Sequence, residues 1–531
     1  MSCSERSRNR RLYAGVTAAF GAVALLLTSC SASMPVEVAA ATGATGDPVM
    51  GGAAQAIQAS EPRALDPAAL SNTWTTQGFL GNALYGTLLI NDVETTAIEG
   101  QMATDFSSTD GGATYTLTLR PDLKFTDGTP LDAAAVKFNW DRLADPTIGS
   151  SSIVQAAVVS SNEVIDPVTL KVTLKQANPH FGQSVVNSVM NWIASPDALA
   201  AGPQSFNQNP VGAGPFTLEQ WSRQDVMELV KNDGYWDAPR PYLDSITLRS
   251  ANDTNQRINT LMAGGADFVM ESNWGSVSKA GTSGFPTDVV PMGGGQYIAM
   301  NTRIAPFDDI RARQAVSLAI DLQSMNLAVY NGKGQVPETL FTENSPFYTD
   351  TELSAYDPQR AQELFDELAD EGKSVSFTYT SFSTVENRAS AESLQAQLST
   401  FDNVNAEVEI VDFPTGLSRL ASRDFQMMVS SANVQDPDYA LSQAFDSTSR
   451  GNVTGLSDAE LDEGLSRGRH ATTDEERRDA YQIVQSRIIE LTPGIFFTRA
   501  APAVVTGEDM GGVHQYGAGS LLPAELWIDN Q

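Results

Sequence analysis

The chain is poor in cysteine and in basic residues. Among its 531 residues there are two cysteines, and 33 Lys and Arg stand against 64 Asp and Glu, which gives a formal net charge of −31 at pH 7. No nucleic acid is therefore expected as a partner, because phosphate binding needs clusters of Lys and Arg, and the basic cluster of this chain lies near the N-terminus. A hydrophobic content of 41% is nevertheless ample for the cores of a globular protein of several domains.

Residue groupings typical of catalysis or of a metal centre are also lacking. His180, His470 and His514 are isolated along the sequence, none has His-Glu-x-x-His spacing, and neither a nucleophile elbow nor a phosphate loop is present. The many Asp and Glu residues allow arbitrary pairs, and nothing in the sequence selects one of them as a glycosidase pair. We therefore predict that the protein is not an enzyme and that it uses no cofactor and no metal.

The N-terminal segment predicts export and attachment to a membrane. Four arginines precede a largely apolar stretch over residues 12–27, which is shorter than the roughly 20 residues of a transmembrane helix. Leu-Thr-Ser then leads into Cys30, the pattern of a bacterial lipoprotein signal. We predict a signal peptide over residues 1–29, lipidation of Cys30 and a flexible tether over residues 30–52, with Sec and twin-arginine export both open. The other cysteine leaves with the signal, so no disulfide is expected.

Downstream of the tether, short strands and amphipathic helices alternate. The hydrophobic residues of 115–119 alternate with threonines, as in a half-buried strand. Asp132, Asp357 and Thr473 are each placed to cap a helix whose hydrophobic residues recur at helical spacing. Strands interleaved with helices over this length predict α/β lobes that are built around mixed sheets.

Several motifs then follow one another in a specific order. They are Tyr115–Leu131 (YTLTLRPDLKFTDGTPL), Asn209–Phe216 (NPVGAGPF), Asn232–Trp236 (NDGYW), Leu261–Asp267 (LMAGGAD), Tyr297–Thr302 (YIAMNT) and Pro306–Ala315 (PFDDIRARQA). This series closely resembles the family 5 extracellular solute-binding proteins, the dipeptide-, oligopeptide- and nickel-binding group of ABC importers. Most of these motifs identify the scaffold of that family and not its binding site.

The resemblance implies a two-lobed periplasmic-binding-protein-like fold with mixed sheets, a hinge and an extra subdomain. Lobe one is expected over residues 53–296 plus 503–531, with the subdomain inserted near 88–205, and lobe two over residues 297–502. Hinge closure would trap the ligand between the lobes. The chain would then be a monomer on the extracytoplasmic face of the membrane, held by the lipid on Cys30. It would deliver a small ligand or short peptide to ABC permease subunits that work with a separate ATPase.

The expected pocket departs from that of the family's oligopeptide binders. Those proteins hold the peptide amino group with an Asp in a short Trp-x-Ala-Asp segment, and the matching position here is Asn433, a neutral amide. Gln435 and Asp436 follow in the same segment, and the Asp436 carboxylate is a candidate replacement for the lost charge. Trp74 and Trp274 stand where family members face the cleft, although a core position is open for each.

The ligand itself therefore stays open at this stage. A short peptide or related compound is the first candidate, and a metal chelate, an opine-like compound or a sugar is the alternative within the family. A ligand-sensing receptor partner and an extracellular hydrolase are the alternatives outside solute uptake.

Overall fold

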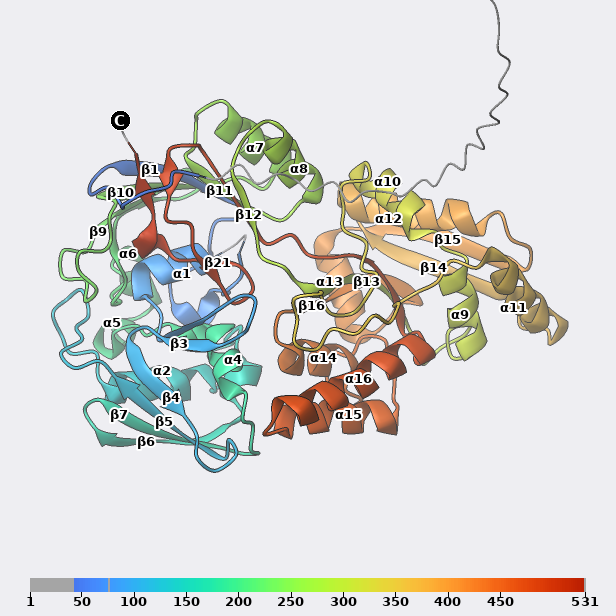
Figure 1. Ribbon diagram of the computed structural model, residues 1–531, viewed down its shortest axis with the longest axis horizontal. Coiled ribbons are helices and arrows are strands. Elements are labelled where there is room, and N and C mark those ends of the chain that lie inside the picture. The colour runs from blue at the N-terminus through green and yellow to red at the C-terminus, as the bar shows by residue number, and fades with distance from the viewer. Residues whose placement is uncertain (1–42, 75–76, 530–531) are drawn as a thin grey trace, which may run out of the picture. The chain divides into compact units, whose positions relative to one another are not determined.

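The computed structural model describes residues 43–74 and 77–529 (Figure 1). Cys30, the predicted signal peptide and the first part of the predicted tether lie outside the described residues. The last part of that tether lies against the body of the protein, since the Ala44 amide donates to the Met510 carbonyl (3.0 Å) and the Gly51 amide to the Tyr242 carbonyl (2.8 Å). Over the described ranges, no helix combines the length and the apolar character that crossing a membrane requires.

Lobe one is organised around a sheet of seven strands. In spatial order these are β12 (Thr287–Val289), β18 (Ala503–Thr506), β11 (Phe268–Glu271), β1 (Ala53–Gln58), β10 (Ser245–Ser250), β9 (Val226–Lys231) and β8 (Phe216–Ser222). β1 pairs in parallel with β10 and β11, and the other neighbouring strands pair in antiparallel. The sheet is therefore mixed, as the sequence predicts. Its helices are α1 (Gly78–Tyr85), α7 (Thr254–Met262) and α8 (Trp274–Thr282).

A second, antiparallel sheet belongs to the segment between β1 and β8. Its strands are, in spatial order, β4 (Ala103–Ser107), β5 (Thr114–Leu119), β7 (Thr169–Leu174) and β6 (Val159–Asp166). Helix α2 (Ala133–Leu143) packs on β6 and β7, and its N-cap is Asp132, whose carboxylate accepts from the Ala135 amide over 2.9 Å. The predicted strand at 115–119 and the predicted cap at Asp132 are both confirmed. The remaining helices here are α3 (Ile153–Ala156), α4 (Phe181–Val186), α5 (Pro196–Ala200) and α6 (Pro203–Gln208).

Short elements complete lobe one. They are the hairpins β2 (Leu89–Asn91) with β3 (Ile98–Gly100) and β20 (Gln515–Tyr516) with β21 (Ser520–Leu521), the pair β19 (Met510–Gly511) with β22 (Trp527–Ile528), and the 3₁₀ turns η1 (Pro67–Ala69), η2 (Val189–Asn191) and η3 (Pro523–Glu525). The C-terminal hairpin β20–β21 lies against helix α1.

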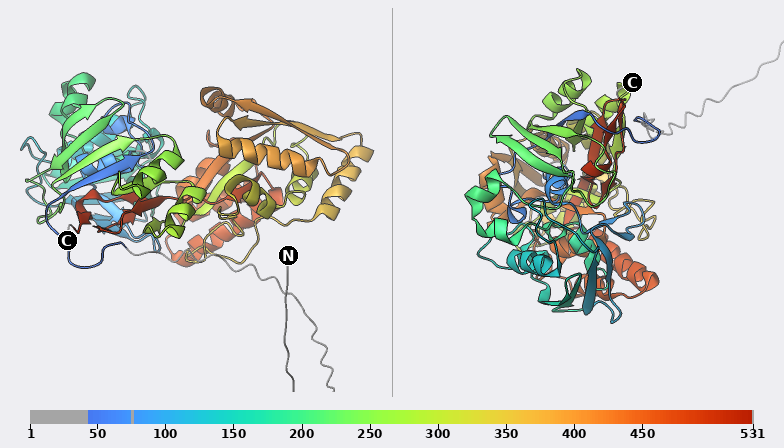
Figure 2. Two further views of the ribbon diagram at one scale, coloured as in Figure 1. Left: turned by 90° about the horizontal axis from the view of Figure 1, so that it is seen from above. Right: turned by 90° about the vertical axis from the view of Figure 1, so that its left-hand side faces the viewer.

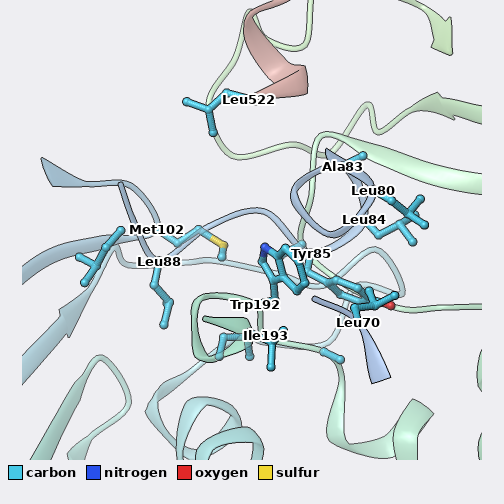
Figure 3. Packing of buried hydrophobic residues seen from close by; sticks show 14 of the residues in the cluster. Leu70, Leu80, Ala83, Leu84, Tyr85, Leu88, Met102, Trp192, Ile193 and Leu522 are labelled. Carbon is cyan, nitrogen blue, oxygen red and sulfur yellow. The ribbon is translucent and has the colours of Figure 1, made fainter. Parts of the chain in front are cut away.

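The core of lobe one joins α1 to segments that are distant in sequence (Figure 3). Trp192 is fully buried beside Tyr85 and Met102, and its ring lies so close to α1 that a Cβ atom at Gly81 would come within 2.3 Å of it. Asn82 of α1 uses all of its hydrogen-bonding capacity in this core. It accepts from Trp192 Nε1 (2.9 Å) and from the Tyr516 hydroxyl (2.8 Å), and it donates to Ser520 Oγ and to the Leu521 carbonyl, each over 2.9 Å.

Lobe two contains a sheet of five strands. In spatial order these are β15 (Val404–Val411), β14 (Val375–Phe382), β16 (Met427–Val434), β13 (Gly293–Met300) and β17 (Gly494–Thr498). Its helices are α9 (Ile310–Leu318), α10 (Leu322–Tyr330), α11 (Pro358–Asp370), α12 (Val385–Leu398), α13 (Phe413–Ser422), α14 (Pro437–Phe445), α15 (Ala459–His470) and α16 (Asp474–Leu491).

Both faces of this sheet are covered by helices. Ile298 and Met300 of β13 belong to the apolar cluster that includes α9, α11 and α12, whereas Tyr297 and Ala299 belong to the cluster that includes α14, α15 and α16. This division follows from the alternation of side chains along a strand. Helix α12 lies along β14 and β15 (Figure 2, left). The strand β16, which carries the predicted pocket segment, is central in the sheet.

The predicted helix caps of lobe two are confirmed, with one difference in detail. Asp357 caps α11, and the Thr473 hydroxyl accepts from the Glu476 amide at the start of α16 (3.2 Å). The Glu476 carboxylate does not return this bond to the Thr473 amide. It accepts instead from the Thr472 amide (3.4 Å), so the capping box is shifted by one residue.

Candidate functional site

Two segments carry the chain between the lobes. Residues 290–292 lead from β12 into β13, and residues 499–502 return from β17 to β18. The Val290 amide donates to the Pro502 carbonyl over 2.9 Å, so the two crossings lie side by side. A pair of adjacent crossings of this kind is suited to act as a hinge.

Trp274, a predicted ligand contact, lies at these crossings. Its indole nitrogen donates to the Arg499 carbonyl (2.9 Å), and its half-buried ring packs against the core of lobe two although it begins helix α8 of lobe one. The Arg499 guanidinium donates to the carbonyls of Met292 (3.3 Å) and Thr339 (2.8 Å). Burial lowers the pKa of Arg499. Trp274 therefore connects the lobes at the hinge, and its use in ligand binding stays a prediction.

Asn433 lies near the end of β16, opposite Gly294 of β13. Gly294 has a φ of +61°, and a Cβ atom there would lie 2.0 Å from the Ala432 carbonyl oxygen, so only glycine fits. The glycine run at 293–295 thus serves close backbone contact at the start of lobe two. The side-chain oxygen of Asn433 is shielded from solvent and has no hydrogen-bond partner among the described residues.

Gln435 follows β16 directly and joins the two lobes. Its side-chain oxygen accepts from Asn91 Nδ2 (3.2 Å) and from Asn187 Nδ2 (3.5 Å), and both of these residues belong to lobe one. Asn91 also donates to Gln183 Oε1 (2.8 Å). The result is a cluster of neutral amides between the lobes, and Gln435 Nε2 within it is shielded from solvent without a partner in the described part of the chain.

Trp74 lies close to this amide cluster, on the side of lobe one. A Cβ atom at Gly519 would come 3.2 Å from Trp74 Cβ and 3.4 Å from Gln515 Oε1, so both side chains adjoin the β20–β21 turn. The same turn reaches the cluster, because the Gly517 amide donates to Asn91 Oδ1 over 2.7 Å. Trp74 Nε1 and Gln515 Oε1 are again shielded from solvent without a partner in residues 43–74 and 77–529.

Asp436 is placed differently from its neighbours Asn433 and Gln435. Its carboxylate receives Arg477 Nη2 at 3.0 and 2.8 Å and also accepts from the Asp438 amide as the N-cap of α14. Asp438 is likewise paired, with Arg469 Nε at 2.7 Å. Both carboxylates are buried and already neutralised, so neither is free for a ligand ammonium in this arrangement. The proposal that Asp436 replaces the family's amine anchor is untested, and the geometry gives it little support.

The lobes also meet directly beside these ion pairs. Asn178 Nδ2 of lobe one donates to Asp438 Oδ2 (3.0 Å), and His180 Nε2 donates to the Ala471 carbonyl (3.0 Å) at the end of α15. Burial, reinforced by the positive charge of Arg477, lowers the pKa of His180, so the neutral imidazole is favoured in this contact.

A cavity lies between the lobes at the amide cluster. The centre of a water molecule can occupy about 20 Å³ of it, so the hollow is nearly closed in this arrangement of the lobes. Its walls are Val93, Glu94 and Thr96 from lobe one, Pro291 from the hinge, and Gly293, Phe341, Thr342, Asn344, Ser345, Pro346, Val434 and Gln435 from lobe two. Among these described residues Glu94 alone carries a charge, and it is exposed. The hollow therefore combines apolar walls with neutral polar groups, as small-molecule sites commonly do.

The other histidines have local partners. His470 Nδ1 bonds to the Ser466 carbonyl (2.7 Å), and His514 Nδ1 to Glu525 (3.0 Å), a hydrogen bond that raises the pKa of His514. Within the residues that the structure describes, no group of three or more His, Cys, Asp or Glu side chains is arranged to hold a metal ion.

The structure thus places Asn433 and Gln435 at the end of β16 and Trp74 beside the turn that reaches the amide cluster. It places Trp274 at the hinge and Asp436 in an ion pair. The sequence did not predict the lobe-one residues that adjoin the predicted site residues. These are Asn91 and Asn187, which bond to Gln435, and Gln515, which lies with Trp74 beside Gly519. No local pattern signals them, because each is an isolated amide residue whose neighbours come from distant segments.

Comparisons with known proteins agree with this architecture. The chain is 29% identical over 413 residues to the glutathione-binding protein GsiB of Salmonella paratyphi A, which covers 75% of this chain and 80% of that protein. Its fold matches NikA of Brucella suis in complex with Fe(III)-EDTA (TM-score 0.77, 21% identity, 90% of this chain and 100% of that chain). It also matches DppA of Helicobacter pylori in complex with the peptide STSA (TM-score 0.75, 21% identity, 90% and 98%).

A family description covers the central part of the sequence. Residues 97–452, well over half of the chain, match the family described as bacterial extracellular solute-binding proteins, family 5 Middle. Together with the two lobes and the hinge between them, this match shows that the chain belongs to family 5 of the bacterial extracellular solute-binding proteins.

Proposed function

We propose that this protein is the solute-binding component of an ABC importer and that it captures a short peptide or a related compound between its lobes. The observation that carries the proposal is the amide cluster, in which Gln435 of lobe two meets Asn91 and Asn187 of lobe one beside a hollow that Gln435 lines. A ligand bound there touches both lobes. The peptide in DppA and the glutathione named for GsiB are compounds of the proposed kind.

Ligand capture works by a shift between open and closed forms. A ligand that contacts both lobes binds the closed form more tightly, and its differential affinity sets how far the population shifts. The polar contacts of Asn178 and His180 with lobe two form only when the lobes are close, so they stabilise the closed form. A permease that recognises the closed form then receives the ligand, and a separate ATPase supplies the energy.

Small-angle X-ray scattering tests this mechanism. A saturating peptide, chosen by calorimetric titration of a peptide panel, is expected to lower the radius of gyration because the lobes close around it. A peptide of the same length that shows no heat of binding serves as the control and should leave the curve unchanged. An unaltered curve in the presence of a ligand with proven binding would contradict closure.

A metal chelate is the alternative suggested by the NikA complex with Fe(III)-EDTA. The neutral groups around the hollow would have to hold such a ligand through its organic part, because the described residues offer no metal-binding cluster. Thermal-shift measurements with peptides, chelates and oligosaccharides in parallel separate these ligand classes.

We also propose that the protein works as a monomer outside the cytoplasmic membrane, anchored by a lipid on Cys30. The support is the lipoprotein pattern of the sequence, Leu-Thr-Ser-Cys, after a short apolar stretch.

The chain offers a matched control for the anchor. Cys30→Ala is expected to move the protein from the membrane pellet to the supernatant after cell fractionation in high salt, because the acyl chains are lost. Cys3→Ala removes the other thiol within the signal peptide and should leave the protein in the pellet. Sedimentation of Cys30→Ala with the membranes would contradict the anchor.

A further inference from the structure

Four side chains around the amide cluster each have one buried polar atom without a partner in the described part of the chain. These atoms are Gln435 Nε2, Asn433 Oδ1, Trp74 Nε1 and Gln515 Oε1, and the four residues are called the amide corner below. Buried polar atoms are nearly always hydrogen-bonded, so water or a bound ligand is expected to complete these four.

The donor character of Gln435 Nε2 is fixed by its neighbours. The Gly517 amide can only donate, so the atom of Asn91 that it meets is the oxygen (2.7 Å). The NH₂ group of Asn91 must then face Gln435, and it donates to the Gln435 side-chain oxygen over 3.2 Å. The nitrogen of Gln435 is left as an unpaired donor.

The acceptor character of Gln515 Oε1 is fixed in the same way. Gln515 Nε2 lies 3.0 Å from a carboxylate oxygen of Asp288, which only accepts hydrogen bonds, so the NH₂ group faces Asp288 and the oxygen stays unpaired. Trp74 Nε1 needs no such argument, because the indole nitrogen is a donor only.

The two halves of the amide corner are linked through Asn187 and the β20–β21 turn. Asn187 donates to Gln435 Oε1 (3.5 Å), and its own side-chain oxygen would lie 2.7 Å from a Cβ atom at Gly517, two residues after Gln515. Trp74 and Gln515 adjoin Gly519 of the same turn, whose Cβ position is also 2.5 Å from Pro502 of the hinge. Asn433 lies opposite Gly294, just past the other hinge crossing.

With the Asn433 amide oriented as in the structure, the amide corner presents two donors and two acceptors, and none of the four side chains is charged. An amide group offers one acceptor and one donor, so two amides match the four atoms. An ammonium offers three donors and no acceptor, and it would leave both N–H groups of the corner unpaired. A carboxylate offers acceptors only and would leave Gln515 Oε1 and Asn433 Oδ1 unpaired.

We propose that the amide corner binds two uncharged amide groups of the ligand, such as consecutive peptide bonds or a carboxamide and a peptide bond, and that it disfavours a charged terminus. This inference rests on the proposed function. The neighbouring carboxylates do not alter it, because Asp436 and Asp438 are each paired with a buried or half-buried arginine. A ligand ammonium placed here would be desolvated without a charged partner.

The test is isothermal titration calorimetry of the purified protein with pairs of dipeptides of the same sequence, because a free dipeptide offers one uncharged amide group and its blocked form offers three. One member of each pair has free termini, and the other is N-acetylated and C-amidated. The blocked peptides are expected to bind at least tenfold more tightly than the free ones. Equal or tighter binding of the free peptides would overturn the inference and leave the proposed function intact. Failure of both sets, together with binding of a chelate or sugar, would contradict the inference and the peptide proposal together.

Single substitutions locate the effect. Gln435→Glu keeps an oxygen toward Asn91 and replaces the unpaired donor by an acceptor, so it should weaken the blocked peptides at least tenfold. Gln220→Glu makes the same chemical change at an exposed position of strand β8 and should not alter binding. Asn433→Asp should reduce the difference in affinity between blocked and free peptides, because it strengthens the binding of the free ones. A preference for blocked peptides that survives both Gln435→Glu and Asn433→Asp in folded protein would overturn the assignment.

Discussion

Replacing Arg477 with methionine is expected to lower the free energy of unfolding by about 3–5 kcal/mol, because the Asp436 carboxylate is then buried without its cation. The side chains of Arg477 and Asp436 are 7% and 5% exposed, and their closest contact is 2.8 Å. Methionine fills much of the arginine volume, so lost packing contributes little. Urea unfolding of the variant and the unchanged protein measures the difference.

A solvent-exposed ion pair supplies the control for this substitution. Arg360 contacts Glu363 and Glu367 on the surface of α11, where all three side chains are more than 40% exposed. Arg360→Met should leave the unfolding midpoint unchanged within experimental scatter, because exposed pairs contribute little. If the unfolding midpoint of Arg477→Met were as close to that of the unchanged protein as the midpoint of Arg360→Met, the pair of Arg477 and Asp436 would not be buried as described.

The same substitution is also expected to weaken ligand binding. Asp436 caps α14 and directly follows Gln435, so its displacement would move the amide that joins the lobes. Calorimetry under conditions in which the variant is still folded separates this effect from the loss of stability.

Replacing Asn82 with leucine is expected to cost about 3–5 kcal/mol of the free energy of unfolding, because several buried groups lose their partner at once. Trp192 Nε1 loses its acceptor, and the Tyr516 hydroxyl loses one of its hydrogen bonds. The Leu521 carbonyl loses its bond from Asn82 as well. Leucine has the same number of side-chain heavy atoms and the same branch at Cγ as asparagine, so no cavity forms and the lost hydrogen bonds dominate the effect. Thermal and urea unfolding both report it.

Asn82→Leu should also reduce ligand affinity, because Asn82 ties the β20–β21 hairpin to α1 and that hairpin carries Gln515. Asn259→Leu is the matched control, since Asn259 is exposed on α7 and its side chain bonds only to Lys279 among the partners that the structure describes. It should change stability by less than about 0.5 kcal/mol. If Asn82→Leu changed the free energy of unfolding as little as this control, the result would contradict the buried hydrogen-bond network of lobe one.

Local structure could be predicted well because its causes are local. Asp132, Asp357 and Thr473 cap the helices for which the sequence places them, since an N-cap bond joins residues two or three apart. The alternation over 115–119 identifies β5 for the same reason. The ordered motifs identified the family, which the match over residues 97–452 confirms, and with it the prediction of a binding protein and not an enzyme.

The site could be predicted only in part. Asn433 and Gln435 were predicted because a short segment resembles the one that carries the family's pocket, and their use by a ligand stays a prediction. The ion pair of Asp436 depends on Arg477, 41 residues further along the chain. Pairing at that distance is set by how α14 packs with α15 and α16, and no periodicity encodes it. Trp274 was placed near the cleft from the motif order, and the structure adds that its indole bonds to the returning hinge segment.

By itself, the sequence determined that this protein is acidic and α/β, because composition, strand and helix periods and cap residues act over a few residues at a time. The two lobes and solute binding came from the resemblance of its motifs to family 5. The tertiary structure alone decided which polar groups are left unpaired. Gln435 meets Asn91 across 344 residues, and Trp74 adjoins a turn near the C-terminus. Whether a buried amide keeps an atom free for a ligand depends on every neighbour that surrounds it, and those neighbours come together only when the chain has folded.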